Sequence, residues 1–188
     1  MLKLGDWLKV RVSSISLTMN LINQKFSYNE INEVMGWISL TPNIIFYSQS
    51  ELVKLSSKNV IKLYKETSLV GCCVVKEINP QFEEIAILIN KPNFYGCGYG
   101  TILFGEGVSQ INSRGRSIFT TTRNSKVIHM ANQHNFVSVR FREIPLNLLL
   151  KKIIYVFHFG RIRESIRKFI AFGKLPRFQN LIKFYQGK

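Results

Sequence analysis

The spacing of apolar residues near the start of the chain predicts a helix. Between Ile31 and Ile38 the apolar residues recur every three or four positions, as on one face of a helix. Ser27 and Glu30 have the spacing of a capping box, in which each side chain satisfies the other residue's backbone amide. We therefore expect a helix over 28–39. Residues 1–25 are compatible with one or two strands or a short helix.

The next part of the chain has the pattern of β-strands. Residues 60–65 alternate apolar and polar positions, as a half-buried strand does. Two longer apolar runs follow at 69–78 and 82–90, and the turn sequence Asn79-Pro80 separates them. These segments predict three antiparallel strands joined by short turns. Residues 43–50 read as a further strand or a loop.

The rest of the pattern mixes helices and strands. In chain order it predicts a helix over 101–111, a strand over 117–122, a helix over 125–134 and a strand over 136–144. The fold class is therefore α/β, with a mixed, mostly antiparallel central sheet and flanking helices. We place this domain at residues 1–144.

Residues 145–188 form the second part of the predicted organisation, a basic helical C-terminal extension packed on the same domain or continuing it. A helix over 161–172 has an apolar face that includes Ile162 and Ile166, and Gly173 ends it. A second helix is expected around Phe178–Tyr185.

The net charge of the chain indicates which kinds of partner it could bind. The net charge is +15, with Glu164 the only acidic residue after Glu143. Such an excess suits nucleic acid or an anionic surface, and basic amphipathic helices suit either. The alternative is that the two helices pack on the sheet and leave a solvated basic face.

Composition narrows the class of protein further. The chain has 188 residues, of which 46% are hydrophobic, enough for one domain with a core. No apolar run reaches the roughly 18 to 20 residues of a membrane-spanning helix, and the first residues have no signal-peptide pattern. We therefore expect a cytoplasmic protein. Its three cysteines are odd in number and lack Cys-x-x-Cys spacing, which indicates reduced thiols and no metal site.

The segment Phe94–Thr101 is the strongest candidate for chemistry. Three glycines alternate there, directly between a predicted strand and a predicted helix. Glycine permits positive φ and close approach of an anion, and the helix start directs unpaired amides and its positive dipole end at the same point. The segment is thus either a phosphate-binding loop or a tight glycine-rich turn.

This loop resembles the Arg/Gln-x-x-Gly-x-Gly/Ala motif of the GNAT superfamily of acyl-CoA-dependent N-acetyltransferases. Gly98 and Gly100 match its glycines, and Tyr95 replaces its leading Arg or Gln. A second stretch, 124–136, resembles the family's downstream motif, with Asn124 and Phe136 in place. The family's usual Tyr is Ala131.

The resemblance implies a GNAT-like fold that binds acetyl-CoA as donor and needs no metal. It implies that loop amides bind the pyrophosphate, that the strand before the loop pairs with the pantetheine arm, and that Asn124 contacts this arm in addition to capping a helix. The implied donor-binding residues are Ile87, Leu88, Ile89, Tyr95, Gly96, Cys97, Gly98, Tyr99, Gly100, Thr101 and Asn124.

Glu84 is the candidate general base. Strict strand alternation puts Glu83 on one face with Ile85, Ile87 and Ile89, and Glu84 on the opposite, more polar face. The surrounding sequence also resembles the base-bearing strand of histone-acetylating members of the family. A solvated carboxylate at the strand end is the alternative.

The expected function is transfer of an acetyl group from acetyl-CoA to a primary amine by direct attack on the thioester. Two alternatives stay open: acetylation of a nucleic-acid-borne amine such as aminoacyl-tRNA, and a binding module that has lost turnover. Ala131 removes the family's usual general acid, for which His129 or His134 is the possible substitute, or the thiolate leaves without help. The acceptor, the acyl chain length and the oligomeric state do not follow from the sequence.

Overall fold

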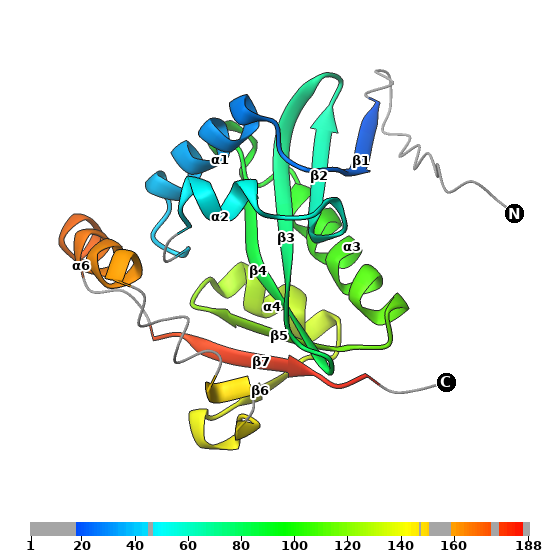
Figure 1. The fold of residues 1–188 in the computed structure, drawn as a ribbon, viewed down its shortest axis with the longest axis vertical. Helices are drawn as coiled ribbons and strands as arrows, with labels where there is room; N and C mark the ends of the chain where they lie inside the picture. The colour runs from blue at the N-terminus through cyan, green and yellow to red at the C-terminus, as the bar shows by residue number, and fades with distance from the viewer. Residues whose placement is uncertain (1–17, 45–46, 147, 151–158, 174–176, 186–188) are drawn as a thin grey trace, which may run out of the picture.

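A computed structural model describes residues 18–44, 47–146, 148–150, 159–173 and 177–185. Its centre is a seven-stranded sheet in the order β1-β2-β3-β4-β5-β7-β6, in which only the β4–β5 pair is parallel. The strands are β1 (Met19–Asn23), β2 (Val60–Lys65), β3 (Ser68–Asn79), β4 (Phe82–Asn90), β5 (Ser117–Thr122), β6 (Val137–Val139) and β7 (Gln179–Lys183). The expected mixed, mostly antiparallel sheet is therefore confirmed (Figure 1).

Helices cover both faces of the sheet. They are α1 (Tyr28–Leu40), α2 (Gln49–Val53), α3 (Tyr99–Ser113), α4 (Ser125–Gln133) and α6 (Phe159–Phe172), with short 3-10 turns η1 (Ser57–Asn59), η2 (Pro92–Phe94) and η3 (Phe141–Glu143). Apolar residues of α3 and α4 form one core with the sheet, and those of α1 and α2 form another on the opposite face. We call these the α3 face and the α1 face.

Most predicted elements are confirmed. The capping box of Ser27 and Glu30 starts α1, and β4 and β5 have the expected bounds. Close packing explains a glycine of α3: a Cβ on Gly107 would lie 3.1 Å from the Cys73 sulfur. Residues 1–17 lie outside the described residues.

The helix expected at 178–185 is wrong, since 179–183 form β7 between β5 and β6. Leu181 and Ile182 are both fully buried because the two faces of β7 meet different cores. A short apolar run of this kind does not distinguish a buried strand from a helix. The last part of the chain therefore completes the central sheet.

Three smaller expectations also need correction. The strand expected at 136–144 is limited to Val137–Val139 because η3 follows. Of the strand or loop expected at 43–50, the described residues before Gln49 form a loop, and α2 then begins with a second capping box at Ser48 and Glu51. β2 is buried on both faces rather than half-buried, and even Lys62 is only 1% exposed.

Lys62 is compatible with the core because it is paired. Its Nζ lies 3.1 Å from both carboxylate oxygens of Glu30 and donates to the Lys25 carbonyl. The Tyr64 hydroxyl also donates to Glu30. Burial alone would raise the pKa of Glu30, but hydrogen bonds from Tyr64, Ser27 and Lys62 outweigh it and hold this pKa below its ordinary value. The same contacts fasten the start of α1 to β2.

We expect Lys62→Met to lower the free energy of unfolding by about 3 kcal/mol, because it leaves the Glu30 carboxylate without its cation. Lys65→Met, at a half-buried position on the same strand, removes only a cation–π contact with Phe94 and should cost less than about 1 kcal/mol. Urea denaturation at neutral pH measures both. If Lys62→Met were as stable as Lys65→Met, the pair would contribute nothing to folding.

Because the pKa of Glu30 is lowered in the folded protein, the free energy of unfolding should depend on pH. A carboxylate with a depressed folded-state pKa stabilises the fold above its unfolded-state pKa, and this contribution disappears as the pH falls through the folded-state value. The stability difference between the wild type and Glu30→Gln should therefore shrink in acid. Denaturation curves at neutral and acidic pH check this, and a difference that is constant with pH would contradict it.

No helix among the described residues combines the length and hydrophobicity needed to cross a membrane.

Candidate active site

The sheet opens between its two parallel strands. β4 and β5 are paired only over Phe82–Glu84 and Ser117–Phe119, and the Thr120 hydroxyl then donates to the Ile85 carbonyl at 3.1 Å. Within the described part of the chain, residues 86–90 of β4 have no strand partner on the β5 side. Their backbone groups therefore border a gap in which an extended chain can pair with β4. Figure 1 shows β5 turning away from β4.

A β-bulge lies where the two strands part. Val74 is opposite Ile87 and Val75 is opposite Ile85, so Ala86 is the extra residue on β4. The bulge exchanges the faces of the strand: Ile85 packs in the core of the α3 face, whereas Ile87 and Ile89 pack on the α1 face. The strict alternation expected for 83–89 is therefore wrong after Ile85.

Each of the strand residues expected to meet the donor borders this gap through its backbone. Ile87 and Ile89 are buried, and Leu88 packs partly buried on the core of the α3 face. Their side chains thus anchor the strand while its backbone edge toward β5 stays open, which is the arrangement that backbone pairing with a ligand requires.

The glycine loop connects the open strand to α3. Gly96 and Gly98 have φ of 88° and 81°, in the left-handed region, and a Cβ built on either meets no atom within 4 Å. Glycine is therefore needed here for the left-handed backbone conformation. It also leaves the space beside the loop open, and tight packing is not the reason for it. No side chain caps α3 at Gly98. Within the described residues, the amides of Gly96, Gly98 and Tyr99 have no acceptor, so they face a space that suits an anion.

Other loop residues shape this space. Thr101 N donates to the Gly98 carbonyl at 3.0 Å, and the Tyr99 ring packs against Phe94. Tyr95 is 55% exposed, and burial of part of its ring raises the pKa of its hydroxyl. Cys97 is an exposed thiol. The sequence-predicted donor residues of the loop therefore do lie together.

Asn90 positions the glycine loop, a role that the sequence did not predict. With its amide oriented to satisfy both groups, the oxygen accepts from Gly100 N at 3.1 Å and the nitrogen donates to the Ile89 carbonyl at 3.3 Å. This bridge joins the end of β4 to the start of α3 and holds the loop in place. Nothing local in the sequence marks it, because the contact spans ten residues and depends on the turn between them.

Glu84 lies at the last paired position before β4 and β5 separate. It is opposite Phe119 on β5 and opposite Lys76 on β3, and it is only 7% exposed. The alternative of a solvated strand-end carboxylate is therefore wrong. Because paired residues share a face, Glu84 lies with Phe119 on the face opposite Glu83. This position is two residues from the bulge, beside the opening of the gap.

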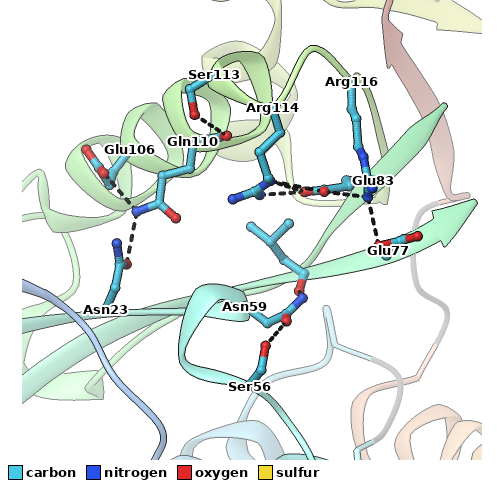
Figure 2. Close-up of polar contacts among 11 residues, drawn as sticks. Asn23, Ser56, Asn59, Glu77, Glu83, Glu106, Gln110, Ser113, Arg114 and Arg116 are labelled. Carbon is cyan, nitrogen blue, oxygen red and sulfur yellow. Dashed lines mark hydrogen bonds and ion pairs between the residues drawn. The ribbon is translucent and has the colours of Figure 1, made fainter. Parts of the chain in front are cut away.

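Glu83 has a structural role that excludes it as the base. Arg114 Nε and Arg116 Nη1 lie 3.0 and 2.8 Å from its carboxylate, and Arg116 also pairs with Glu77 (Figure 2). Glu83 is 3% exposed, so both cations compensate its burial. The pairs connect the end of α3 to β3 and β4, far along the sheet from the glycine loop.

α4 follows β5, the strand that separates from β4 at the gap. The Asn124 side chain accepts from Lys126 N at 3.0 Å, which confirms its N-cap role. Ala131 is fully buried in the core, so the position of the family's usual Tyr offers no hydroxyl.

His129 and His134, the two possible substitutes for this Tyr, lie in different surroundings. His134 lies at the opposite end of the helix from Asn124, against the Phe104 ring, and burial together with the charge of Lys183 lowers its pKa. His129 is exposed.

Arg123 is a second residue that the sequence did not reveal. It follows β5, donates to the Pro42 carbonyl, and lies over the Phe178 ring at 4.5 Å. Its Nε is buried without a hydrogen-bond partner, and burial lowers its pKa. Arg123 therefore ties the end of β5 to the segment after α1 and to the approach to β7. Among the described residues, no group of His, Cys, Asp and Glu is arranged to hold a metal ion.

Comparison with known proteins identifies the architecture. The sequence matches no protein-family model and no curated protein. The structure is similar to N-acetylglutamate synthase from Neisseria gonorrhoeae complexed with coenzyme A and N-acetyl-glutamate, with a TM-score of 0.63 and 15% identity over 90% of this chain. The chain spans only 35% of that enzyme.

Two other solved structures match along nearly their whole length. Rv2747 from Mycobacterium tuberculosis, in complex with CoA and NLQ, has a TM-score of 0.65 and 9% identity over 89% of this chain and 99% of its own. An acetyltransferase of the GNAT family from Streptococcus pneumoniae has a TM-score of 0.57 and 13% identity, over 89% and 99%. The TM-scores establish the fold, which is that of the GNAT acetyltransferases, as the sequence motifs predicted. At identities this low, the comparisons establish nothing beyond the fold.

Proposed function

We propose that this chain, which has the GNAT fold, is an N-acetyltransferase that moves an acetyl group from acetyl-CoA to a primary amine. The observation that carries the proposal is the open edge of β4 between the bulge at Ala86 and an unfilled glycine loop. An extended pantetheine arm needs an unpaired strand edge, and a pyrophosphate needs exposed amides. The two features lie at successive points of one strand–loop–helix unit, in the order that the donor requires.

Each donor-binding residue has a proposed role. Backbone amides from Tyr95 to Thr101 bind the pyrophosphate, with the N-terminus of α3 adding its positive dipole end. The backbone of Ile87, Leu88 and Ile89 pairs with the pantetheine arm. Asn124 contacts the same arm from across the gap while it caps α4.

The reaction is a direct transfer. A backbone N–H of the open strand near the bulge stabilises negative charge on the thioester oxygen. The amine nitrogen forms a bond to the carbonyl carbon, and Glu84 accepts the proton that the amine loses, directly or through a water molecule. The carbon–sulfur bond then breaks and the thiolate leaves with its electron pair. A thiol pKa of about 8.5 makes it an adequate leaving group without a protein acid.

The test of donor binding is calorimetric titration of the full chain with acetyl-CoA and, separately, with acetylpantetheine. Acetyl-CoA should bind, and acetylpantetheine much more weakly, because it lacks the pyrophosphate and the nucleotide beyond it. Release of thiol from acetyl-CoA in the presence of a panel of amines then measures turnover. Acetyl-CoA binding without thiol release for any amine would favour the binding-module alternative, and no binding would contradict the proposal.

An amine carried on aminoacyl-tRNA is the second candidate acceptor, and the net charge of +15 favours it. Neutralised phosphates make such binding strongly dependent on salt. Filter binding of charged tRNA at low and moderate salt tests it. Affinity that does not change with salt, or no binding at all, would remove this candidate and leave acetyl transfer itself untouched.

A further inference from the structure

α6 is attached to the protein through a lysine. Lys168 is 1% exposed, and its Nζ donates to the carbonyls of Ile38 at 2.9 Å and Thr41 at 2.6 Å, and to that of Ile44. These carbonyls lie in and just after the last turn of α1, where the helix dipole is negative. The Lys168 cation therefore caps the carbonyl groups at the C-terminal end of α1. It also fixes which side of α6 faces the protein.

The opposite side of α6 is apolar and exposed. Ile166, Phe169 and Ile170 are 57%, 63% and 77% exposed. At about 100° per residue, this face is centred on the far side of the helix from Lys168. Leu40, which is 66% exposed, lies at the end of α1 where Lys168 binds. Among the described residues of α6, the buried side chain is therefore that of Lys168, and the apolar residues Ile166, Phe169 and Ile170 are not packed on the sheet as the packing alternative expected.

The segment that carries this apolar face is strongly basic. The chain after Glu143 contains ten Lys and Arg residues and one Glu. Arg167, next to the buried lysine, is exposed and donates to the Ser39 carbonyl at 3.4 Å. A helix with an exposed apolar face, within a strongly basic segment, has the properties of a helix that lies in a lipid–water interface.

We propose that the exposed face of α6, formed by Ile166, Phe169 and Ile170, binds the surface of an anionic lipid bilayer. The apolar side chains enter the boundary between headgroups and acyl chains, and the net positive charge of the chain after Glu143 attracts anionic headgroups.

The observations disfavour other occupants. Nucleic acid is bound through phosphates, and the centre of this face presents aliphatic and aromatic groups instead of cations. A second copy of the chain would bring two strongly basic segments together, which costs electrostatic free energy.

Co-sedimentation of the full chain with vesicles tests the proposal. One set of vesicles is phosphatidylcholine alone, and the other contains about one third phosphatidylserine. The chain should sediment with the anionic vesicles and remain in solution with the neutral ones, and moderate salt should weaken binding. The variant Phe169→Ser/Ile170→Ser should bind the anionic vesicles at least about tenfold more weakly.

The matched control is Tyr28→Ser/Val137→Ser, which removes two apolar side chains of similar exposure from the start of α1 and from β6. It should bind like the wild type. If the α6 variant and the wild type bound anionic vesicles equally, the proposal would be overturned. It would also be overturned if the wild type bound tRNA and the α6 variant did not. The proposal would also be overturned if the wild type formed a dimer that the α6 variant does not form and did not bind vesicles. Binding does not depend on acetyl transfer, so either proposal can fail while the other stands.

Discussion

Replacing Glu84 by Gln should lower turnover by about a hundredfold or more at neutral pH, because general base catalysis contributes roughly 10² to 10⁴ to a rate. Gln preserves the size of the side chain and its hydrogen-bonding capacity but does not accept a proton from the amine. The affinity for acetyl-CoA should stay the same, since the proposed donor contacts are made by the loop and by the backbone of β4 beyond the bulge. Thiol release measures the rate, and calorimetry measures the affinity.

The pH profile separates a base from a structural carboxylate. The kcat/KM of Glu84→Gln should stay below the wild-type value at every pH, because the amide does not accept the proton that the amine loses. Glu77→Gln is the control, because Glu77 is a half-exposed carboxylate on the neighbouring strand and pairs with Arg116. It should keep the wild-type profile. If turnover of Glu84→Gln were unchanged at every pH, the assignment of the base would be wrong.

Replacing Gly98 by Val should weaken acetyl-CoA binding by about a hundredfold. Gly98 has φ of 81° and open space around its Cβ position. A valine there strains the backbone by about 1–2 kcal/mol and places its methyl groups where a pyrophosphate would approach the amides. The fold should survive, since no atom lies within 4 Å of the added Cβ. Calorimetric titration with acetyl-CoA measures the effect.

Gly173→Val is the matched control for backbone strain. Gly173 has φ of 69°, also lies in open space, and ends α6 rather than starting α3. The two variants should lose similar stability, but only Gly98→Val should lose affinity for acetyl-CoA. Equal affinities in both variants would show that the loop is only a turn.

The conformation of the glycine loop and the cap of α4 could be predicted from the sequence because their determinants are local. Alternating glycines after an apolar strand and before a helix specify the loop within one segment, and the structure places them as expected. Asn124 is similarly marked by its position before α4. Capping boxes and apolar periodicity are also local signals, which is why α1, β4 and β5 have nearly the predicted bounds.

Features that depend on distant partners could not be predicted. The bulge at Ala86 exists only in the register between β3 and β4, and it decides which face each later side chain of β4 takes. The burial of Glu84 follows from pairing with β5, more than thirty residues away. Lys62 is tolerated in the core because Glu30 of another element reaches it.

The C-terminal part of the chain shows the same division most clearly. The sequence by itself determined that residues 161–172 form an amphipathic helix and that the whole segment is basic. Only the tertiary structure decided that Leu181 and Ile182 belong to a strand, because the sheet offers an unfilled place between β5 and β6. It also decided that α6 turns its lysine inward, because the carbonyls that end α1 need a donor and Lys168 supplies one. Periodicity determines which residues share a face, whereas the partners available in the fold determine where that face points.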